Sequence, residues 1–446
     1  MTQRTHWSST FGYILATAGA AIGLGNLWKF PYLVGEQGGA LFIGLYLLFV
    51  AGIGFPLLLL ETTMGRLEPS HPTVGLKKLS HLPTWIGTST AWTGMLVLFM
   101  ILGFYSVFSS ISFAYIEHAL LDQFTAKTPL QISGLWDRLQ HNTVQLVILH
   151  GVFIGLTLWI TAQGVVEGIE RACKWMMPLL FAILIILVVF ALNIGEVGKT
   201  VDFLLIPNWE RFSWRTPVAA LGQAFFTLAV GAGCMYTYGN YIDPKIKLVR
   251  SLAWVTFLNV GVAMLAGFAI FPLVFHYNLS AAAGPGLMYI VLPNAFAQMA
   301  GGQYIALMFF ILLFLASLTS AVSLVEPLMR GLMTHFKISR VKSAWVIGVL
   351  GFCMGMPTIA ALGAPDTPLS ARLFQMMIDL PSEILLPFSG LGFTIIGAYG
   401  LNKVRLNHSL QLGPIGFTVF RFLIKVVTPI GIVAILGQAF WKMFLS

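Results

Sequence analysis

The sequence is poor in charged residues. Asp, Glu, Lys and Arg make up only 9% of its 446 residues, whereas soluble domains carry about 25%. This scarcity excludes a cytosolic enzyme, a disordered scaffold and a nucleic-acid-binding protein. Cysteine is also rare, and the three present (Cys173, Cys234, Cys353) lie in or beside apolar stretches, so we expect no disulfide or zinc framework. Because 57% of the residues are hydrophobic, the predicted fold class is an all-α polytopic membrane protein.

Long apolar runs define the expected spans. A helix needs about 20 mostly apolar residues to cross the hydrocarbon. Eleven spans are predicted, near 11–33, 38–60, 84–116, 142–166, 175–194, 216–242, two within 251–325, 343–365, 373–400 and 420–441. The stretch 276–302 contains two prolines and several glycines, so we expect a loop there. Residues 1–446 are expected to form one membrane domain.

The positive charges indicate orientation. With the N-terminus in the cytoplasm, 17 of the 25 Lys and Arg residues fall in inner segments and seven in outer segments. The positive-inside rule therefore predicts a cytoplasmic N-terminus and, after eleven spans, a C-terminus outside. The net charge of +9 is then explained by contact with anionic membrane lipid, with no nucleic-acid partner.

Glycines interrupt two of the predicted spans. Gly19, Gly23 and Gly25 lie in the first span, and the sixth contains a small-residue stretch at 227–233. Small residues also allow close helix packing, but spans one and six are five apart. Matching interruptions in two five-helix halves favour an inverted repeat with a binding site between them. The freed carbonyls of a broken helix suit a small cation and its freed N–H groups suit a carboxylate. A neutral amino acid bound together with sodium satisfies both.

The motifs around these breaks resemble those of one transporter family. Trp7, 19–26 and 29–32 are similar to the neurotransmitter:sodium symporter family of LeuT-type transporters, with support from 61–66, 225–228 and 316–320. The resemblance implies a single transporter domain, 1–446, with a LeuT-type 5+5 inverted repeat. The first repeat spans about 8–194 and the second about 212–402, and an extra eleventh span covers about 417–443, as in shorter bacterial members. It also implies a multi-pass protein of the bacterial inner membrane.

The resemblance further implies two sodium sites, with sodium as the coupling ion and no cofactor. The first would use the Ala21 carbonyl, the side chains of Asn26, Thr227 and Asn259, and the substrate carboxylate. The second would use the carbonyls of Gly19, Ile22 and Ala316 with the hydroxyls of Thr319 and Ser320. All-oxygen ligation fits a hard cation. Hydroxyls bonded back to their own helix are the alternative for Thr319 and Ser320.

The same resemblance implies a substrate site in which the carboxylate meets the N–H groups of Leu24 and Gly25 and the Tyr105 hydroxyl. Family members that take amines without a carboxylate place an aspartate at the position of Gly23. The glycine therefore points to an amino acid. The small Ala229 and Ala232 indicate a large hydrophobic or aromatic one. The implied substrate-binding residues are Ala21, Gly23, Leu24, Gly25, Ile101, Tyr105, Phe226, Thr227, Ala229, Ala232, Ser320 and Leu324.

Gates are also implied by the family pattern. Lys29 matches a basic outer gate, Asp379 is the nearest carboxylate to pair with it, and Phe226 would cover the substrate. The implied inner gate is formed by Arg4, Trp7 and Tyr241. The acid expected at the end of span eight is replaced by 334–335, so the inner gate either lacks an ion pair or uses Glu326 or Asp243.

Glu61 and a possible chloride site each allow two interpretations. Glu61 is expected either to accept hydrogen bonds from N–H groups freed in span six or to pair with Arg66. Tyr46 and Gln223 match a chloride site of some members, whereas Ala263 replaces both the serine of those members and the carboxylate of the others. Cycles with and without chloride are both compatible with these residues.

Other function classes have less support. No metal-ligand spacing or Ser/His/Asp set indicates an enzyme, and no charge ring or filter repeat indicates an ion channel. A proton-coupled amino-acid carrier of the same fold is the nearest alternative. It would be expected to place a titratable group at a cation site, where this sequence has only neutral side chains.

Overall fold

The computed structural model describes residues 6–281, 286–365 and 367–444, and every regular element among them is helical. Within those ranges nine helical runs are long and apolar enough to cross a membrane: Ala40–Leu67, Thr84–Leu120, Thr143–Ala162, Val165–Ile194, Leu248–His276, Gly302–Phe336, Arg340–Gly363, Pro368–Gly400 and Pro414–Trp441. In lipid a helix satisfies its own backbone hydrogen bonds, which is why apolar runs become helices.

The first and sixth spans are broken, as predicted. In the first, Thr10–Ala21 and Gly25–Glu36 meet at 53°. In the sixth, α11 (Arg215–Thr227) and α12 (Cys234–Gly239) are separated by the unwound residues 228–233. These two interrupted spans and the nine continuous ones fill the eleven predicted positions.

The remaining bounds complete the order of elements. The first span consists of α1 (Thr10–Ala21), η1 (Gly25–Lys29) and α2 (Phe30–Glu36). Spans two to five contain α3 (Ala40–Phe49), η2 (Val50–Gly54), α4 (Phe55–Leu67), α6 (Thr84–Leu120), α8 (Thr143–Ala162), η3 (Val165–Glu170) and α9 (Arg171–Ile194). Spans seven to nine are α13 (Leu248–His276), α15 (Gly302–Phe336) and α16 (Arg340–Gly363). Spans ten and eleven contain α17 (Pro368–Phe374), η6 (Gln375–Leu385), α18 (Leu386–Ile395), η7 (Ile396–Gly400), α20 (Pro414–Phe422), η8 (Leu423–Val427) and α21 (Thr428–Phe444). The connections contain α5 (Pro72–Leu79), α7 (Pro129–His141), α10 (Val197–Leu205), η4 (Trp209–Arg211), η5 (Leu287–Val291), α14 (Leu292–Ala297) and α19 (Lys403–Leu410).

Two predicted span boundaries and one expected loop differ from the structure. The fifth span begins at Val165 rather than 175, directly after Gly164 with its positive φ of 111°. The eighth continues to Phe336, because Glu326 is paired with Arg340 and its charge does not end the helix. The expected loop at 276–302 contains η5 and α14, since Pro293 lies in the first turn of α14, where a proline is tolerated.

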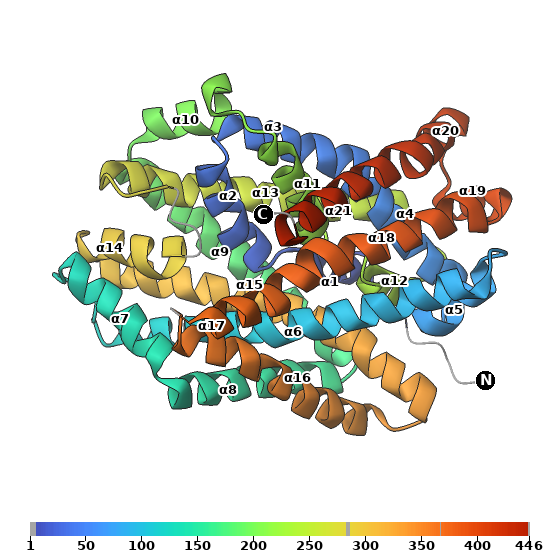
Figure 1. The fold of residues 1–446 in the computed structure, drawn as a ribbon, viewed down its shortest axis with the longest axis horizontal. Coiled ribbons are helices and arrows are strands. Elements are labelled where there is room, and N and C mark those ends of the chain that lie inside the picture. Colours follow the sequence, from blue (N-terminus) through green and yellow to red (C-terminus); the bar gives the residue numbers. More distant parts are fainter. Residues whose placement is uncertain (1–5, 282–285, 366, 445–446) are drawn as a thin grey trace.

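The broken spans lie inside a layer of long helices. Helices α6, α8, α15 and α16, which form spans three, four, eight and nine, pack on one another, and α1 contacts α9, α13 and α15. Helix α12 packs on α4 and α15. Figure 1 shows α1 and α12 near the centre of the molecule, with α6 and α15 passing beside them. The two breaks are therefore surrounded by protein.

Hydrogen bonds through two histidines connect the short helix α5 to span eight. Thr73 Oγ lies 2.7 Å from both His71 Nδ1 and His335 Nε2, and His71 Nε2 donates to the Pro327 carbonyl at 3.2 Å. Burial lowers the pKa of His71 to about 4, so this ring is neutral near pH 7. A neutral ring donates through one nitrogen and accepts through the other, as these hydrogen bonds of His71 require.

Candidate functional site

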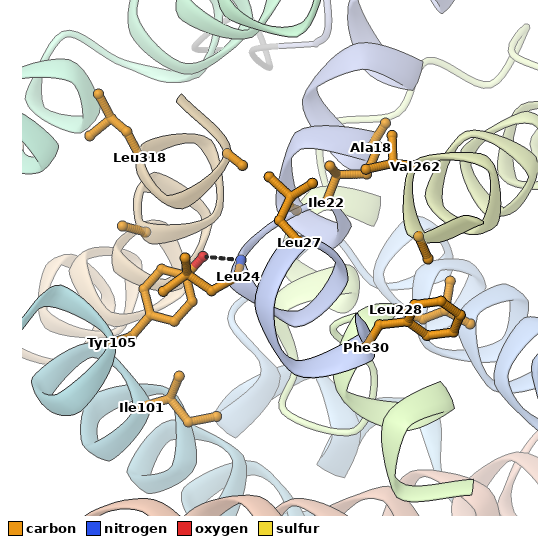
Figure 2. Close-up of a cluster of buried hydrophobic side chains, with 14 of the residues drawn as sticks. Ala18, Ile22, Leu24, Leu27, Phe30, Ile101, Tyr105, Leu228, Val262 and Leu318 are labelled. Atoms are coloured by element: carbon orange, nitrogen blue, oxygen red, sulfur yellow. Dashed lines mark hydrogen bonds between the residues drawn. The ribbon is translucent and has the colours of Figure 1, made fainter. Parts of the chain in front are cut away.

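The break in span one exposes backbone groups to the interior. Helix α1 ends at Ala21, and Ile22 turns to an extended conformation with φ −86° and ψ 98°. The N–H of Leu24 is thereby free of the helix, and it donates to Tyr105 Oη of α6 at 3.2 Å, as Figure 2 shows. A Cβ at Gly23 would lie 2.5 Å from both Tyr105 Oη and Ser320 Oγ. Glycine is therefore required where α6 and α15 approach the break.

The break in span six has a different cause. Ala229, Gly231 and Gly233 all have positive φ angles, of 51°, 92° and 83°. Left-handed conformations cannot continue a right-handed helix, and glycine adopts them without a steric cost. The N–H groups after Thr227 consequently need other acceptors.

Glu61 of α4 supplies those acceptors. Its buried carboxylate accepts from the N–H groups of Gly231 (2.7 Å), Met235 (3.0 Å) and Tyr236 (3.3 Å). Arg66 donates instead to the carbonyls of Pro244 and Ile246. Of the two alternatives for Glu61, the first is therefore observed: its carboxylate accepts from one N–H of the unwound residues and from two in the first turn of α12.

A cavity lies between the two breaks, and we call it the central pocket. Ten of the twelve predicted substrate-binding residues line it: Ala21, Gly23, Gly25, Ile101, Tyr105, Phe226, Ala229, Ala232, Ser320 and Leu324. The other two, Leu24 and Thr227, do not line it, although the Leu24 N–H donates to the lining residue Tyr105. Among the described residues that line this pocket, none is acidic or basic.

Four lining residues were not predicted, namely Ala20, Leu98, Cys234 and Leu386. Leu98 precedes Ile101 and Tyr105 by three and seven residues, so helical spacing on α6 could have identified it. Leu386, the first residue of α18, has no such signal in the sequence.

The residues predicted for the first sodium site lie close together. One terminal atom of the Asn259 amide lies 2.9 Å from Asn26 Nδ2, 3.1 Å from the Thr227 carbonyl oxygen and 3.3 Å from the Ala21 carbonyl oxygen. The Thr227 hydroxyl points elsewhere, donating to the Gln223 carbonyl at 2.9 Å. Thr227 thus presents its carbonyl to this cluster, whereas its side chain was predicted to do so.

The groups predicted for the second sodium site also meet. Ser320 Oγ donates across to the carbonyls of Gly19 (3.0 Å) and Ile22 (3.2 Å). Thr319 Oγ donates to the Ala316 carbonyl of its own helix at 3.0 Å. The Thr319 hydroxyl is therefore bonded back to its own helix through its proton, which leaves its oxygen lone pairs open, whereas Ser320 links α15 to the break in span one.

Lys29 and Phe226 of the predicted outer gate are in contact. The Lys29 ammonium lies 4.7 Å from the centre of the Phe226 ring, a cation–π distance. Phe226 also packs on Gly25, where a Cβ would lie 2.9 Å from the ring. Asp379 is on η6 and lines a second cavity together with Arg372 and Gln375.

On the predicted inner side, Arg4 lies outside the described residues. The Trp7 N–H donates to the Tyr241 carbonyl at 2.9 Å, and its indole donates to the Tyr238 carbonyl at 3.2 Å. Tyr241 Oη donates to Glu326 at 2.7 Å, and Glu326 is buried in an ion pair with Arg340. Of the two acids considered, Glu326 joins this cluster, while Asp243 accepts from the nearby Lys245 N–H.

The residues that match a chloride site are buried and neutral. Tyr46 Oη lies 3.2 Å from Thr227 Oγ, and Gln223 Nε2 donates to the Gly25 carbonyl at 2.6 Å. Ala263 is fully buried. Gln223 therefore fastens span six onto the segment that follows the break in span one.

Known proteins are similar to this chain in sequence and in architecture. Residues 4–131 and 122–444 match the model of the sodium:neurotransmitter symporter family. The sodium-dependent transporter YhdH of Bacillus subtilis is 33% identical over 435 residues, which are 96% of each chain. A sodium-dependent transporter of Haemophilus influenzae is 31% identical over 90% of each.

A solved structure has the same architecture. The crystal structure of MhsT in complex with L-phenylalanine superposes with a TM-score of 0.90 at 32% identity, covering 98% of this chain and all of that one. The LeuT-type architecture and sodium as the coupling ion, both predicted from the motifs, are confirmed by these matches. The chain belongs to the sodium:neurotransmitter symporter family, whose members are sodium-dependent membrane transporters.

Proposed function

We propose that this symporter imports a neutral amino acid with a large hydrophobic or aromatic side chain. The observation that carries the proposal is the composition of the central pocket. The Leu24 N–H, which is released from the helix, donates to the hydroxyl of the lining residue Tyr105, and the described lining residues carry no charge. A ligand that satisfies such a pocket brings its own carboxylate and amino group.

The two helix breaks support a zwitterionic ligand bound with sodium. Carbonyls at the C-terminal end of α1 and the oxygens around Asn259 suit a cation, and the N–H groups that begin η1 suit a carboxylate. The opposite charges then compensate one another in a site of low dielectric constant, where an isolated charge is costly.

The size of the side chain is inferred from the pocket wall. Ala229 and Ala232 are small and leave space between α6 and span six. The complex of MhsT with L-phenylalanine supports an aromatic substrate. We therefore rank phenylalanine, tryptophan and leucine above alanine and glycine.

Transport then proceeds by alternating access to the central pocket from the two sides of the membrane. We infer that the broken spans rock against a scaffold of spans three, four, eight and nine, whose helices pack together. The distribution of Lys and Arg supports a cytoplasmic N-terminus in a bacterial inner membrane. Trp7, Tyr241 and Glu326 would then close the cytoplasmic side, and Lys29 with Phe226 the outer side.

Binding of radiolabelled tryptophan and leucine to the purified chain tests the proposal. We expect saturable binding in sodium that is lost in potassium or choline, and competition by phenylalanine but not by glycine. Binding that ignores sodium and follows pH would instead favour a proton-coupled carrier. Competition by glycine or alanine alone would contradict the predicted substrate size.

Replacing Gly23 by alanine is expected to weaken amino-acid binding about 10- to 100-fold. The added Cβ would lie 2.5 Å from Tyr105 Oη and Ser320 Oγ, and overpacking of this kind costs about 1–3 kcal/mol. The measurement is the dissociation constant of labelled phenylalanine in saturating sodium. Gly222→Ala is the control, because a Cβ there meets no atom within 4 Å. Equal affinities of the two variants would refute the predicted role of Gly23.

A further inference from the structure

The unwound part of span six is held between α6 and α18. A Cβ at Gly94 of α6 would lie 2.7 Å from the Ala232 carbonyl oxygen. On the other side, a Cβ at Gly231 would lie 3.1 Å from the Leu386 carbonyl oxygen and 3.3 Å from Gly390 Cα. The backbone of this segment therefore touches the backbones of both helices, and it has no room to move away from a larger substrate.

The two helices are also fixed to each other. Ser389 Oγ of α18 donates to the Thr90 carbonyl of α6 at 3.1 Å. A Cβ at Gly392 would lie 2.0 Å from Thr90 Oγ, so the helices are in direct contact. The walls of the pocket are consequently close-packed here, and their side chains limit its depth.

Each of these two helices contributes a leucine to the central pocket. Leu98 and Leu386 line the central pocket beside Ala229 and Ala232, and they are only 1% and 3% exposed. We infer that Leu98 and Leu386 determine the largest amino-acid side chain that the transporter accepts, so that span ten contributes to substrate selection. This inference rests on the proposed function and specifies its substrate class further.

Shortening either leucine should favour larger substrates. One or two methylene groups in an apolar pocket change selectivity about 10- to 200-fold. For Leu98→Ala and Leu386→Ala, we expect the affinity for tryptophan relative to leucine to rise at least about 10-fold. Leu386→Phe should act in the opposite direction and lower the affinity for tryptophan relative to valine.

Binding of alanine, valine, leucine, phenylalanine and tryptophan to the full-length chain in saturating sodium tests the inference. The controls are Leu96→Ala and Leu385→Ala. Leu96 is 47% exposed on α6, and Leu385 directly precedes the pocket-lining Leu386. Leu386→Val retains most of the side chain and should shift the ratio in the same direction to a smaller extent, in case the alanine variant fails to fold.

The outcomes separate the inference from the proposed function. Ratios that change with ligand size in the pocket variants but not in the controls support it. A uniform loss of affinity for all five ligands overturns the size limit and leaves neutral amino-acid transport intact. A folded wild-type chain that binds none of the five in sodium overturns the proposed function and the inference together.

Discussion

Replacing Glu61 by glutamine is expected to weaken sodium-dependent amino-acid binding strongly. The carboxylate accepts three backbone N–H groups through its two oxygens. A glutamine amide has one oxygen, and its NH2 group would face an N–H donor. A buried donor left without an acceptor costs about 1–3 kcal/mol, so affinity should fall about 10- to 100-fold. Binding of labelled phenylalanine in saturating sodium measures the loss.

A matched control is available on the same chain. Glu167 carries an exposed carboxylate that pairs with Arg171 four residues later. Exposed pairs of this kind contribute about 0–1 kcal/mol, so Glu167→Gln should bind as the wild type does. Gel filtration and the melting temperature report whether Glu61→Gln remains folded. A folded Glu61→Gln variant that binds within threefold of wild type would show that the unwound segment keeps its shape without the carboxylate.

The position of each span could be predicted because lipid imposes a strong rule. A chain crossing the hydrocarbon must satisfy its own backbone, so an apolar run of about 20 residues becomes a helix. The glycines at 19, 23 and 25 identified the broken span for the same reason. The rule says nothing about residues beyond the hydrocarbon. There the pairing of Glu326 with Arg340 extends α15, and α14 forms in a stretch rich in glycine and proline.

The site was predictable where it depends on polar or small residues in an apolar span. Glu61 and Gly23 are conspicuous in such surroundings, the family resemblance added Asn26 and Asn259, and the structure gives each a partner or a close contact. Leucines in a span carry no such signal. Leu96 is 47% exposed and Leu98 is 1% exposed, although both are leucines with nearly the same neighbours in the sequence. In the sequence, only its helical spacing from Ile101 and Tyr105 distinguishes Leu98 from Leu96, and Leu386 has no such companion.

Replacing Thr319 by valine is expected to raise the sodium concentration needed for half-maximal binding by about 10- to 100-fold. Valine has nearly the shape of threonine but lacks the hydroxyl, and a polar contact to a charged group contributes about 1.5–3 kcal/mol. Thr319 Oγ donates to the Ala316 carbonyl, so its lone pairs remain available to a cation. A Cβ at Gly19 would lie 3.1 Å from Thr319 Cβ, which places the residue beside the predicted carbonyl ligand. Sodium titration of phenylalanine binding measures the change.

Ser317→Ala is the control for this effect, because the Ser317 hydroxyl donates only within its own helix, to the Phe314 carbonyl at 2.9 Å. If Thr319→Val and Ser317→Ala require the same sodium concentration, the Thr319 hydroxyl serves its helix and is no ligand. Thr319→Ser separates ligation from packing, since it keeps the hydroxyl and removes one methyl group. Recovery of wild-type sodium affinity in Thr319→Ser therefore assigns the loss in Thr319→Val to the missing oxygen rather than to a defect between α1 and α15.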